Sequence, residues 1–276
     1  MTVAAPRSPS NLALRLATIA VGLPVVVGLV WLGGAAFAIA AGAVALLASA
    51  EFTHGWLLPS RPIREVARHV TGFAAPALVV AGSHWDEDYV FLGAILLAVT
   101  AGLGWAPAHP FGPRKPFRVQ AGALAYTGLL LSTLVLTRDL EDGRDWVLVG
   151  LLSTFATDSG AYAAGRLFGR HPLAPRISPK KTVEGAIGGY VVGAAAVVGL
   201  STGLSTGASF ATILPLALAL PLASQAGDLF ESWIKRRMGV KDASGLLPGH
   251  GGFLDRLDSL LFVFPLVYAY LQWRVV

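Results

Sequence analysis

The sequence predicts an all-α, polytopic transmembrane protein with about nine helices. Of its 276 residues, 54% are hydrophobic and 13% are charged, whereas soluble domains carry about 25% charged residues. The mean hydropathy is +0.63. The apolar residues form runs that are suited to a hydrocarbon core about 30 Å thick. Because segments of about ten residues with alternating polarity are absent, the runs are predicted to be helices and not the strands of a barrel.

Nine apolar runs are predicted to cross the membrane, and the third and fourth are short. They cover residues 14–32, 35–52, 66–82, 89–103, 119–137, 146–168, 183–204, 210–234 and 256–273. We expect one membrane domain, 14–276, after a short disordered cytoplasmic tail, 1–13. Within this domain, helices in 14–145 have no assigned role, and 146–276 is predicted to be the catalytic half.

The charge of the loops predicts the orientation of the chain. With the N-terminus inside, the cytoplasmic segments contain 18 of the 21 Lys and Arg residues, and the outside receives only Arg138, Arg144 and Arg274. The two longer outside loops are acidic. Because segments rich in Lys and Arg stay cytoplasmic, we expect a cytoplasmic N-terminus and an external C-terminus. The net charge of +5 is therefore a topology signal and does not indicate a nucleic-acid partner.

Carboxylates enter the predicted membrane only in the second half of the chain. Asp158 lies inside the sixth run, and Asp228 and Glu231 lie inside the eighth. At a rise of 1.5 Å per residue they are on the order of 10 Å below the cytoplasmic boundary. A charge at mid-membrane costs roughly 2.5 to 3.5 kcal/mol on insertion scales, so these groups are candidates for function. In the first half, Glu51 and Glu65 are interpreted only as cytoplasmic boundary residues.

Two consecutive helices are predicted to bring four carboxylates together. Asp228 and Glu231 share one face of the eighth helix, and Asp255 and Asp258 share one face at the start of the ninth. Oxygen ligands suit a hard cation such as Mg²⁺, so all four are predicted metal ligands. The absence of cysteine excludes thiolate metal sites and disulfides. The alternative is that Asp228 and Asp255 form structural ion pairs with Arg236, Arg237 or Arg256.

Basic residues and glycines flank these carboxylates. A basic loop precedes the seventh helix, whose N-terminus favours an anion; its residues include Ser178, Lys180, Lys181 and Thr182. A glycine-rich loop precedes the ninth helix and offers backbone N–H groups to phosphate oxygens; it contains Gly249, His250, Gly251 and Gly252. The alternatives are a topology determinant and a tight turn. The pair Gly185 and Gly189 is interpreted as small-residue helix packing.

The stretch from Ser232 to Asp258 resembles the signature of the phosphatidate cytidylyltransferase, or CDP-diacylglycerol synthase, family. The matching residues are Ser232, Lys235, Arg236, Lys241, Asp242, His250, Gly251, Gly252, Asp255, Arg256 and Asp258. Two further stretches, which begin at Asp158 and Ser178, extend the resemblance over about residues 155–260. The first half resembles the family only in hydropathy and in small features such as Glu51.

The resemblance implies the reaction CTP + phosphatidic acid → CDP-diacylglycerol + pyrophosphate, for phospholipid synthesis. We expect catalytic roles for Asp228, Asp255, Lys181 and Asp258, with Mg²⁺ as cofactor and a second cation left open. The residues expected to bind substrates are Asp158, Arg176, Ser178, Lys180, Lys181, Thr182, Arg236, Lys241, His250 and Arg256. The expected partners are CTP, phosphatidic acid and membrane lipids, and a homodimer is left open. We expect an integral protein of a bacterial plasma membrane whose active site faces the cytoplasm.

Two rival functions are disfavoured by the sequence. A proton-coupled transporter also buries carboxylates, but it has little use for a surface loop of glycines flanked by lysines. A CDP-alcohol phosphotransferase would carry a D-x-x-D-G-x-x-A-R pattern followed by D-x-x-x-D. That pattern is absent, and the last acidic pair is Asp255-x-x-Asp258.

Overall fold

The computed structural model describes residues 11–57, 71–105, 114–204, 206–241, 243–244, 246 and 251–275. The described part of the N-terminal half consists of helices. They are α1 (Asn11–Leu32), α2 (Gly34–Leu57), α3 (Thr71–Gly82), α4 (Asp88–Trp105), and a continuous helix of α5 (Arg114–Ala123), the π-helical turn η2 (Leu124–Leu129) and α6 (Leu130–Asp139).

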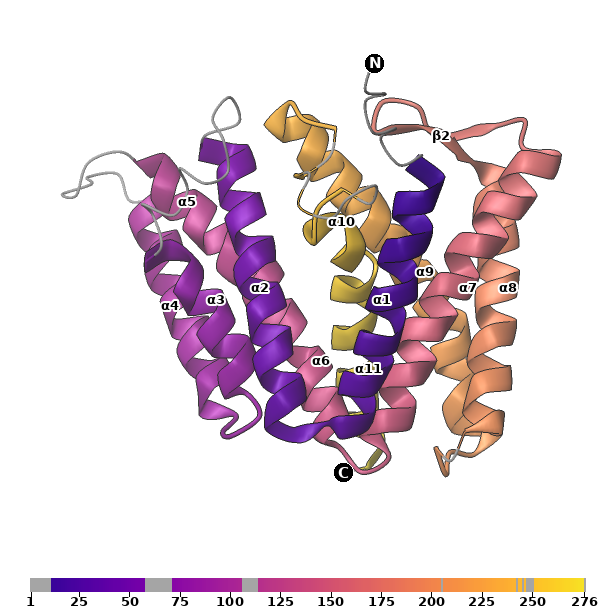
Figure 1. Cartoon of the computed structure of the whole chain (residues 1–276), viewed down its shortest axis with the longest axis horizontal. Coiled ribbons are helices and arrows are strands. Elements are labelled where there is room, and N and C mark those ends of the chain that lie inside the picture. The colour runs from indigo at the N-terminus through magenta and orange to yellow at the C-terminus, as the bar shows by residue number, and fades with distance from the viewer. Residues whose placement is uncertain are drawn as a thin grey trace, which may run out of the picture.

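The C-terminal half adds a small β-hairpin to the helices. Its elements are α7 (Gly143–Phe168), strands β1 (Pro172–Ala174) and β2 (Ser178–Thr182), α8 (Val183–Gly203), α9 (Phe210–Met238), the short α10 (Leu254–Leu257) and α11 (Leu260–Val275). The strands pair antiparallel, with Ala174 opposite Ser178. In Figure 1 the long helices run roughly parallel, and the hairpin and the start of α1 lie at the end opposite to the end of α11. We call these the hairpin end and the opposite end.

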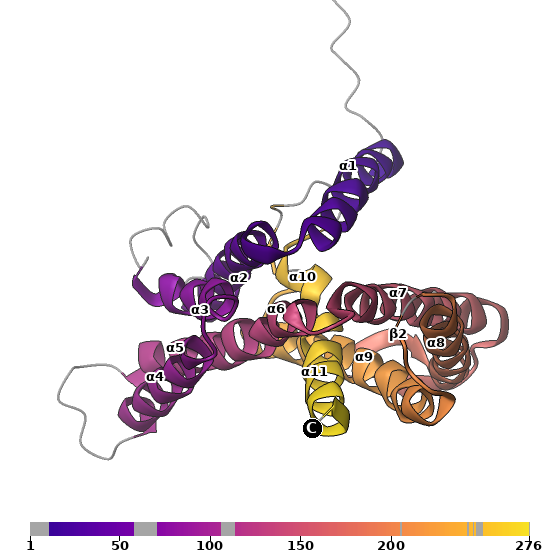
Figure 2. The same ribbon diagram turned by 90° about the horizontal axis from the view of Figure 1, so that it is seen from below.

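Seen along the helices, α6 and α11 lie between two groups of helices (Figure 2). Helices α2 to α5 form one group, and α7, α8 and α9 form the other. The buried core includes Phe264 of α11, Val147 of α7 and Leu131 of α6, which are at most 1% exposed. The central pair therefore joins the two halves of the chain through close apolar packing, which between helices in lipid stabilises through van der Waals contacts.

Glycines allow α7 and α8 to pack closely. A Cβ at Gly189 would lie 2.7 Å from the carbonyl oxygen of Thr157, and one at Gly185 would lie 2.9 Å from that of Ala161. Any larger residue would push the helices apart, as expected for small-residue interfaces between membrane helices. The predicted packing role of Gly185 and Gly189 is confirmed.

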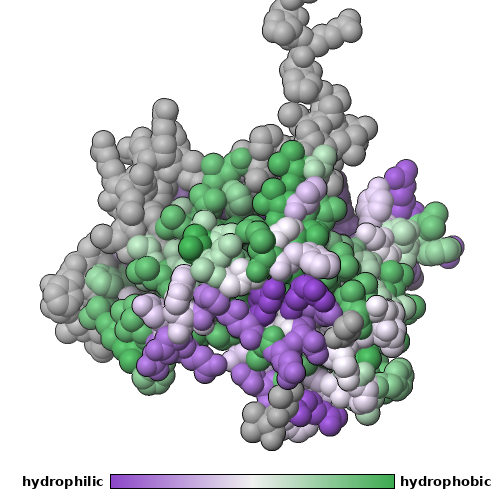
Figure 3. All heavy atoms as spheres, turned by 60° about the horizontal axis from the view of Figure 1, so that its bottom comes forward, coloured by the Kyte–Doolittle hydropathy of each residue, from purple (hydrophilic) through white to green (hydrophobic). Residues whose placement is uncertain are grey.

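The outer surface of the helices is apolar, as a membrane protein requires. Phe91, Ile187 and Leu222 are among its exposed large hydrophobic side chains. Figure 3 brings the opposite end forward, where polar side chains gather while apolar ones cover the flanks. Within the described residues, the helical segments long and apolar enough to cross a membrane are Gly34–Leu57, Lys115–Asp139, Val183–Gly203 and Phe210–Met238. The predicted all-α membrane class is confirmed.

Three details differ from the prediction. Helix α1 already begins at Asn11, inside the predicted tail, whose residues 1–10 lie outside the described residues. The hairpin replaces the predicted loop before the seventh run. The ninth run starts with a break, because α10 ends at Leu257 and α11 begins at Leu260. At the break the Asp258 carboxylate accepts a hydrogen bond from the backbone N–H of Ser259 at 2.7 Å, a local contact that competes with helix formation.

Candidate active site

Three carboxylates and one lysine meet toward the hairpin end of the C-terminal half. Asp228 of α9 forms an ion pair with Lys181 of β2, and their side chains are 31% and 27% exposed. Asp158 of α7 and Asp258 at the α10–α11 break both lie close enough to Asp228 for electrostatic repulsion between the carboxylates. We call Asp158, Asp228 and Asp258 the carboxylate cluster. The structure thus brings together residues predicted from three separate stretches of the sequence.

Gly227 allows α9 to touch the backbone of the α10–α11 break. A Cβ at this position would overlap the carbonyl oxygen of Asp258 and lie 3.0 Å from the Cα of Ser259. Contacts this short with backbone atoms cannot be relieved by moving a side chain. Asp228 follows Gly227 directly. The close approach therefore brings the carboxylate of Asp228 on α9 and that of Asp258 at the break into the same region.

Two neighbouring lysines of strand β2 lie in different surroundings. Successive side chains of a strand point to opposite faces, and Lys180 is exposed whereas Lys181 is half-buried against Asp228. Ser178 is half-buried and Arg176 is exposed in the turn before it. The hairpin is tied to α9 because the Arg236 guanidinium donates to the carbonyl oxygen of Ile177 at 3.2 Å.

The N-terminus of α8 is capped by Thr182, the residue directly before the helix. The hydroxyl of Thr182 accepts a hydrogen bond from the backbone N–H of Gly185 at 3.1 Å, which satisfies one of the free donors at the start of the helix. The carboxylate of Glu184 accepts hydrogen bonds from the backbone N–H groups of Arg170 and His171. Thr182 therefore has a structural task that the sequence prediction did not assign.

A second ionic group lies behind the first and includes Glu231, Lys235 and Asp255; we call it the loop anchor. The Lys235 ammonium lies 2.5 Å from Glu231 and 2.8 Å from Asp255. The contact with Glu231 is an ion pair and not an aligned hydrogen bond. Asp255 also accepts from the backbone N–H of Gly252 at 2.7 Å and of Ala243 at 3.1 Å.

These contacts decide what Asp255 can do. The hydrogen bonds that its carboxyl group accepts from Lys235 and from the backbone N–H of Gly252 favour its charged form. Asp255 is therefore a charged group whose oxygens already accept hydrogen bonds from the backbone of Ala243 and Gly252. The alternative considered from the sequence named arginines as the partners of Asp228 and Asp255. The structure instead pairs Asp228 with Lys181 and Asp255 with Lys235.

Glu51 of α2 is a functional candidate that the sequence interpretation missed. It is 1% exposed and accepts hydrogen bonds from the Ser244 hydroxyl at 2.5 Å and from the backbone N–H groups of Phe253 and Leu254 at 3.0 and 2.8 Å. A Cβ at Gly252 would lie 2.5 Å from its carboxylate. The interpretation of Glu51 as a mere boundary residue was wrong, because this carboxylate holds the segment before α10. The available signal was a lone carboxylate at the end of an apolar run.

The remaining predicted site residues are Arg236, Lys241, His250 and Arg256. Arg256 is exposed and interacts electrostatically with Asp158. Lys241 is exposed after the end of α9, and Arg236 also donates to the carbonyl oxygen of Val240 at 3.4 Å. His250 lies outside the described residues.

The match to a family model extends over nearly the whole chain. Residues 13–274 match the model described as the cytidylyltransferase family. The chain belongs to this family.

Curated relatives agree with this membership. Proteins of Staphylococcus haemolyticus, Staphylococcus saprophyticus and Staphylococcus aureus, each named phosphatidate cytidylyltransferase, are 41% identical to the chain over 145 residues. The match covers 52% of this chain and 55% of each relative. The chain thus spans about half the length of the curated relatives that it matches.

The carboxylate cluster is the part of the site whose residues could hold a divalent cation. The cluster contains three carboxylates, whereas the Lys181 ammonium forms an ion pair with only one of them, Asp228. Asp228 and Asp258 fit as ligands, because Mg²⁺ usually takes one or two carboxylates and completes its shell with water and substrate phosphates. Among the described residues no three His, Asp or Glu side chains enclose a metal by themselves. Glu231 and Asp255 fit less well as metal ligands. Both already form ion pairs with Lys235, and Asp255 also binds the backbone of Ala243 and Gly252.

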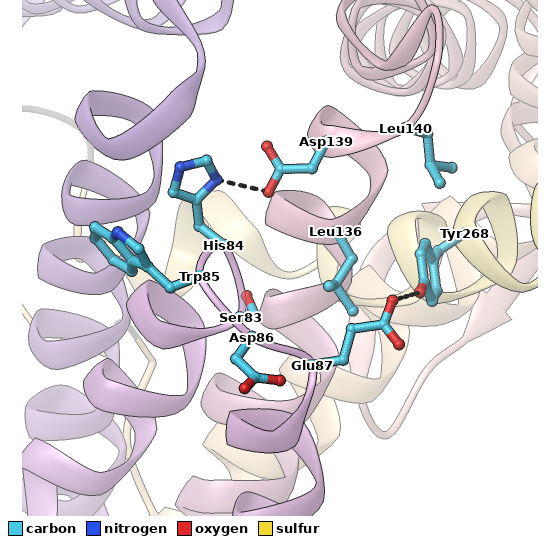
Figure 4. A pocket seen from close by; sticks show the side chains of 9 residues that line it. All are labelled: Ser83, His84, Trp85, Asp86, Glu87, Leu136, Asp139, Leu140 and Tyr268. Atoms are coloured by element: carbon cyan, nitrogen blue, oxygen red, sulfur yellow. Dashed lines mark hydrogen bonds and ion pairs between the residues drawn. The ribbon is translucent and has the colours of Figure 1, made fainter.

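A further pocket lies at the opposite end. It has a volume of about 200 Å³ and is lined by the turn after α3, the end of α6 and Tyr268 of α11 (Figure 4). His84 Nδ1 lies 2.9 Å from the Asp139 carboxylate, and the Tyr268 hydroxyl donates to Glu87 at 3.4 Å. None of the predicted site residues lines this pocket. These contacts connect the turn to α6 and α11, and we assign the pocket no part in the chemistry.

Proposed function

We propose that this protein transfers the cytidylyl group of CTP to phosphatidic acid and produces CDP-diacylglycerol and pyrophosphate. The observation that carries the proposal is the carboxylate cluster with its Lys181–Asp228 ion pair, set in an apolar helical protein toward the end that carries the basic hairpin. Membership of the cytidylyltransferase family and the names of the staphylococcal relatives support it. A site of this kind can meet a water-soluble nucleotide and a lipid together.

The proposed reaction is a direct displacement. An oxygen of the lipid phosphate attacks the α-phosphorus of CTP and forms a new P–O bond. The bond from the α-phosphorus to the oxygen that bridges it to the β-phosphorus breaks, and its electron pair leaves with pyrophosphate. Because the nucleophile is already an anionic oxygen, the protein needs mainly to align the reactants and to stabilise negative charge.

The residues of the site divide this work. Lys181 would exchange its contact with Asp228 for the triphosphate, and Arg256 would neutralise the remaining phosphate charge. Asp228 and Asp258 would hold Mg²⁺, and Asp158 would orient Arg256 or the nucleotide. The bound cation would supply charge neutralisation at the reacting phosphates. The loop anchor would keep Asp255, and with it the backbone of Gly252, in place next to the site.

The test is a reconstituted reaction with separate readouts for both products. Purified protein in lipid nanodiscs should release pyrophosphate and form CDP-diacylglycerol only when CTP, phosphatidate and Mg²⁺ are all present. Asp228→Asn should abolish both products, and Asp86→Asn at the opposite end is the matched control. Release of pyrophosphate without phosphatidate, or no lipid product with the unaltered protein, would contradict the proposal.

We also propose that nine helices cross a bacterial plasma membrane with the hairpin end in the cytoplasm. The hairpin end carries basic residues such as Arg170 and Lys180, whereas the opposite end carries acidic ones such as Glu141, which is the expected asymmetry. The cysteine-free chain allows a clean test. In intact cells a membrane-impermeant maleimide should label Glu141→Cys but not Arg170→Cys. The reverse pattern, or labelling of both, would refute this orientation.

A further inference from the structure

Tyr126 has a buried hydroxyl without a hydrogen-bond partner among the described residues. The residue belongs to η2 and is 5% exposed. An unpaired buried hydroxyl costs about 1–3 kcal/mol, and buried polar groups in native proteins nearly always have a partner. The position of Tyr126 therefore indicates that its hydroxyl meets a group outside the described residues.

The surroundings of this hydroxyl belong to the candidate active site. It lies close enough to Glu231, Asp258 and Asp228 to interact electrostatically with each of them. The hydroxyl of Ser259, next to Asp258, is also buried and without a partner among the described residues. Two buried hydroxyls without a partner among the described residues therefore belong to residues that neighbour the carboxylate cluster.

The ring of Tyr126 connects this place to the lipid-facing surface. It packs edge-on against Phe230 with ring centroids 5.4 Å apart, and Phe230 stacks on Trp233 at 5.8 Å. Phe230 and Trp233 are 38% and 39% exposed on the outside of α9. We call Trp233, Phe230 and Tyr126 the aromatic row. It is apolar where it faces lipid and ends in a polar group inside, which suits a molecule with the same polarity.

The backbone at Tyr126 is unusual for a membrane helix. Leu124–Leu129 forms one π-helical turn between the α-helical segments α5 and α6. Single π-turns within α-helices occur frequently at functional sites. This turn carries Tyr126 and adds an independent reason to expect a role in the chemistry.

We propose that the Tyr126 hydroxyl donates a hydrogen bond to the phosphate of the lipid substrate, whose chains lie along the aromatic row. The proposal rests on the proposed function. A neutral donor suits this place, because it binds a phosphate oxygen without forming a permanent ion pair with the neighbouring carboxylates. CTP reaches the cluster from the other side, through the basic residues of the hairpin. Tyr126 is therefore a substrate-binding residue specific to the lipid.

The first test is steady-state kinetics of Tyr126→Phe in nanodiscs of defined phosphatidate content. The variant keeps the ring and removes only the hydroxyl. The expected result is a fall in kcat/KM for phosphatidate by about 10-fold or more, the loss expected for a hydrogen bond to a charged group. The KM for CTP should stay within about twofold. Tyr270→Phe, whose hydroxyl meets Arg274 in α11 at 3.3 Å, is the matched control and should leave both unchanged.

The second test measures binding without turnover, so it still reports on Tyr126 if the proposed reaction fails. Bromine-labelled phosphatidate should quench the fluorescence of Trp233 in a background in which the other tryptophans are replaced by phenylalanine. The same brominated chains on diacylglycerol are the control lipid. The unaltered protein should prefer phosphatidate, and Tyr126→Phe should lose about 10-fold of this preference. Equal effects on CTP and phosphatidate, an effect on CTP alone, or an unchanged preference would overturn the proposal.

Discussion

Replacing Glu51 tests whether the N-terminal half supports the site. Its carboxylate accepts hydrogen bonds from the backbone N–H groups of Phe253 and Leu254 and from the hydroxyl of Ser244. A buried donor left without an acceptor costs about 1–3 kcal/mol, so Glu51→Ala, which strands two backbone donors, should destabilise by about 2–6 kcal/mol. Glu51→Gln keeps one acceptor but turns a donor toward the Leu254 N–H, so we expect about 1–3 kcal/mol.

The assay combines thermal unfolding in detergent with activity in nanodiscs. At roughly 2–4 °C per kcal/mol for domains of this size class, Glu51→Gln should lower the unfolding midpoint by about 2–12 °C. Its activity should fall even at temperatures well below that midpoint, because Glu51 holds Phe253 and Leu254 at the start of α10, the helix that carries Asp255. Glu87→Gln is the matched control, since Glu87 makes its contact with Tyr268 at the opposite end. An unchanged midpoint together with unchanged activity in Glu51→Gln would refute the reasoning.

The remaining predictions concern the carboxylate cluster and the hairpin. Lys181→Ala should raise the KM for CTP by about 10- to 150-fold, the range for charge-assisted contacts to phosphate. Lys180→Ala should change this KM much less, because the Lys180 side chain lies on the exposed face of β2. Equal effects of the two variants, measured as initial rate against CTP concentration, would contradict this assignment. Asp258→Asn should abolish turnover at any Mg²⁺ concentration while the protein still inserts and purifies, and near-normal rates in a Mg²⁺ titration would remove Asp258 from the proposed metal ligands. Thr182→Ala should lower the unfolding midpoint by about 2–4 °C, corresponding to roughly 1 kcal/mol for a lost N-cap, and should leave the KM for CTP nearly unchanged; a large rise in that KM would restore the substrate-binding role predicted from the sequence.

Hydropathy predicted the helices well because each helix in lipid must satisfy its own backbone and present apolar side chains outward. The predicted runs 183–204 and 210–234 agree closely with α8 (Val183–Gly203) and the start of α9 (Phe210–Met238). The hairpin could not be predicted in the same way. Its strands are short and polar, and the five residues of β2 include Pro179 and two lysines, so they lack the alternating apolar pattern on which strand prediction depends.

The sequence predicted most residues of the candidate site, but not that they form two separate ionic groups. Helical periodicity correctly placed Asp228 and Glu231 near one another on α9, yet it could not show that they take part in different ionic groups. That division depends on Lys181 and Lys235, which reach the two carboxylates from β2 and from the next turn of α9. Glu51 was not predicted as a site residue because its partners are about two hundred residues away in the chain, and no local spacing rule reports such a contact.

The two lysine–carboxylate pairs differ in a way that matches different tasks. The Lys181–Asp228 pair is half-buried and joins a strand of the hairpin to α9. Its members can exchange partners when an anion and a cation arrive, because both side chains remain partly accessible to water, which weakens their attraction. Lys235 is instead enclosed between Glu231 and Asp255, where removing one partner would leave a buried charge at a cost of roughly 3–5 kcal/mol. The first pair is therefore suited to open during the reaction, and the second is suited to keep the loop in place while it does.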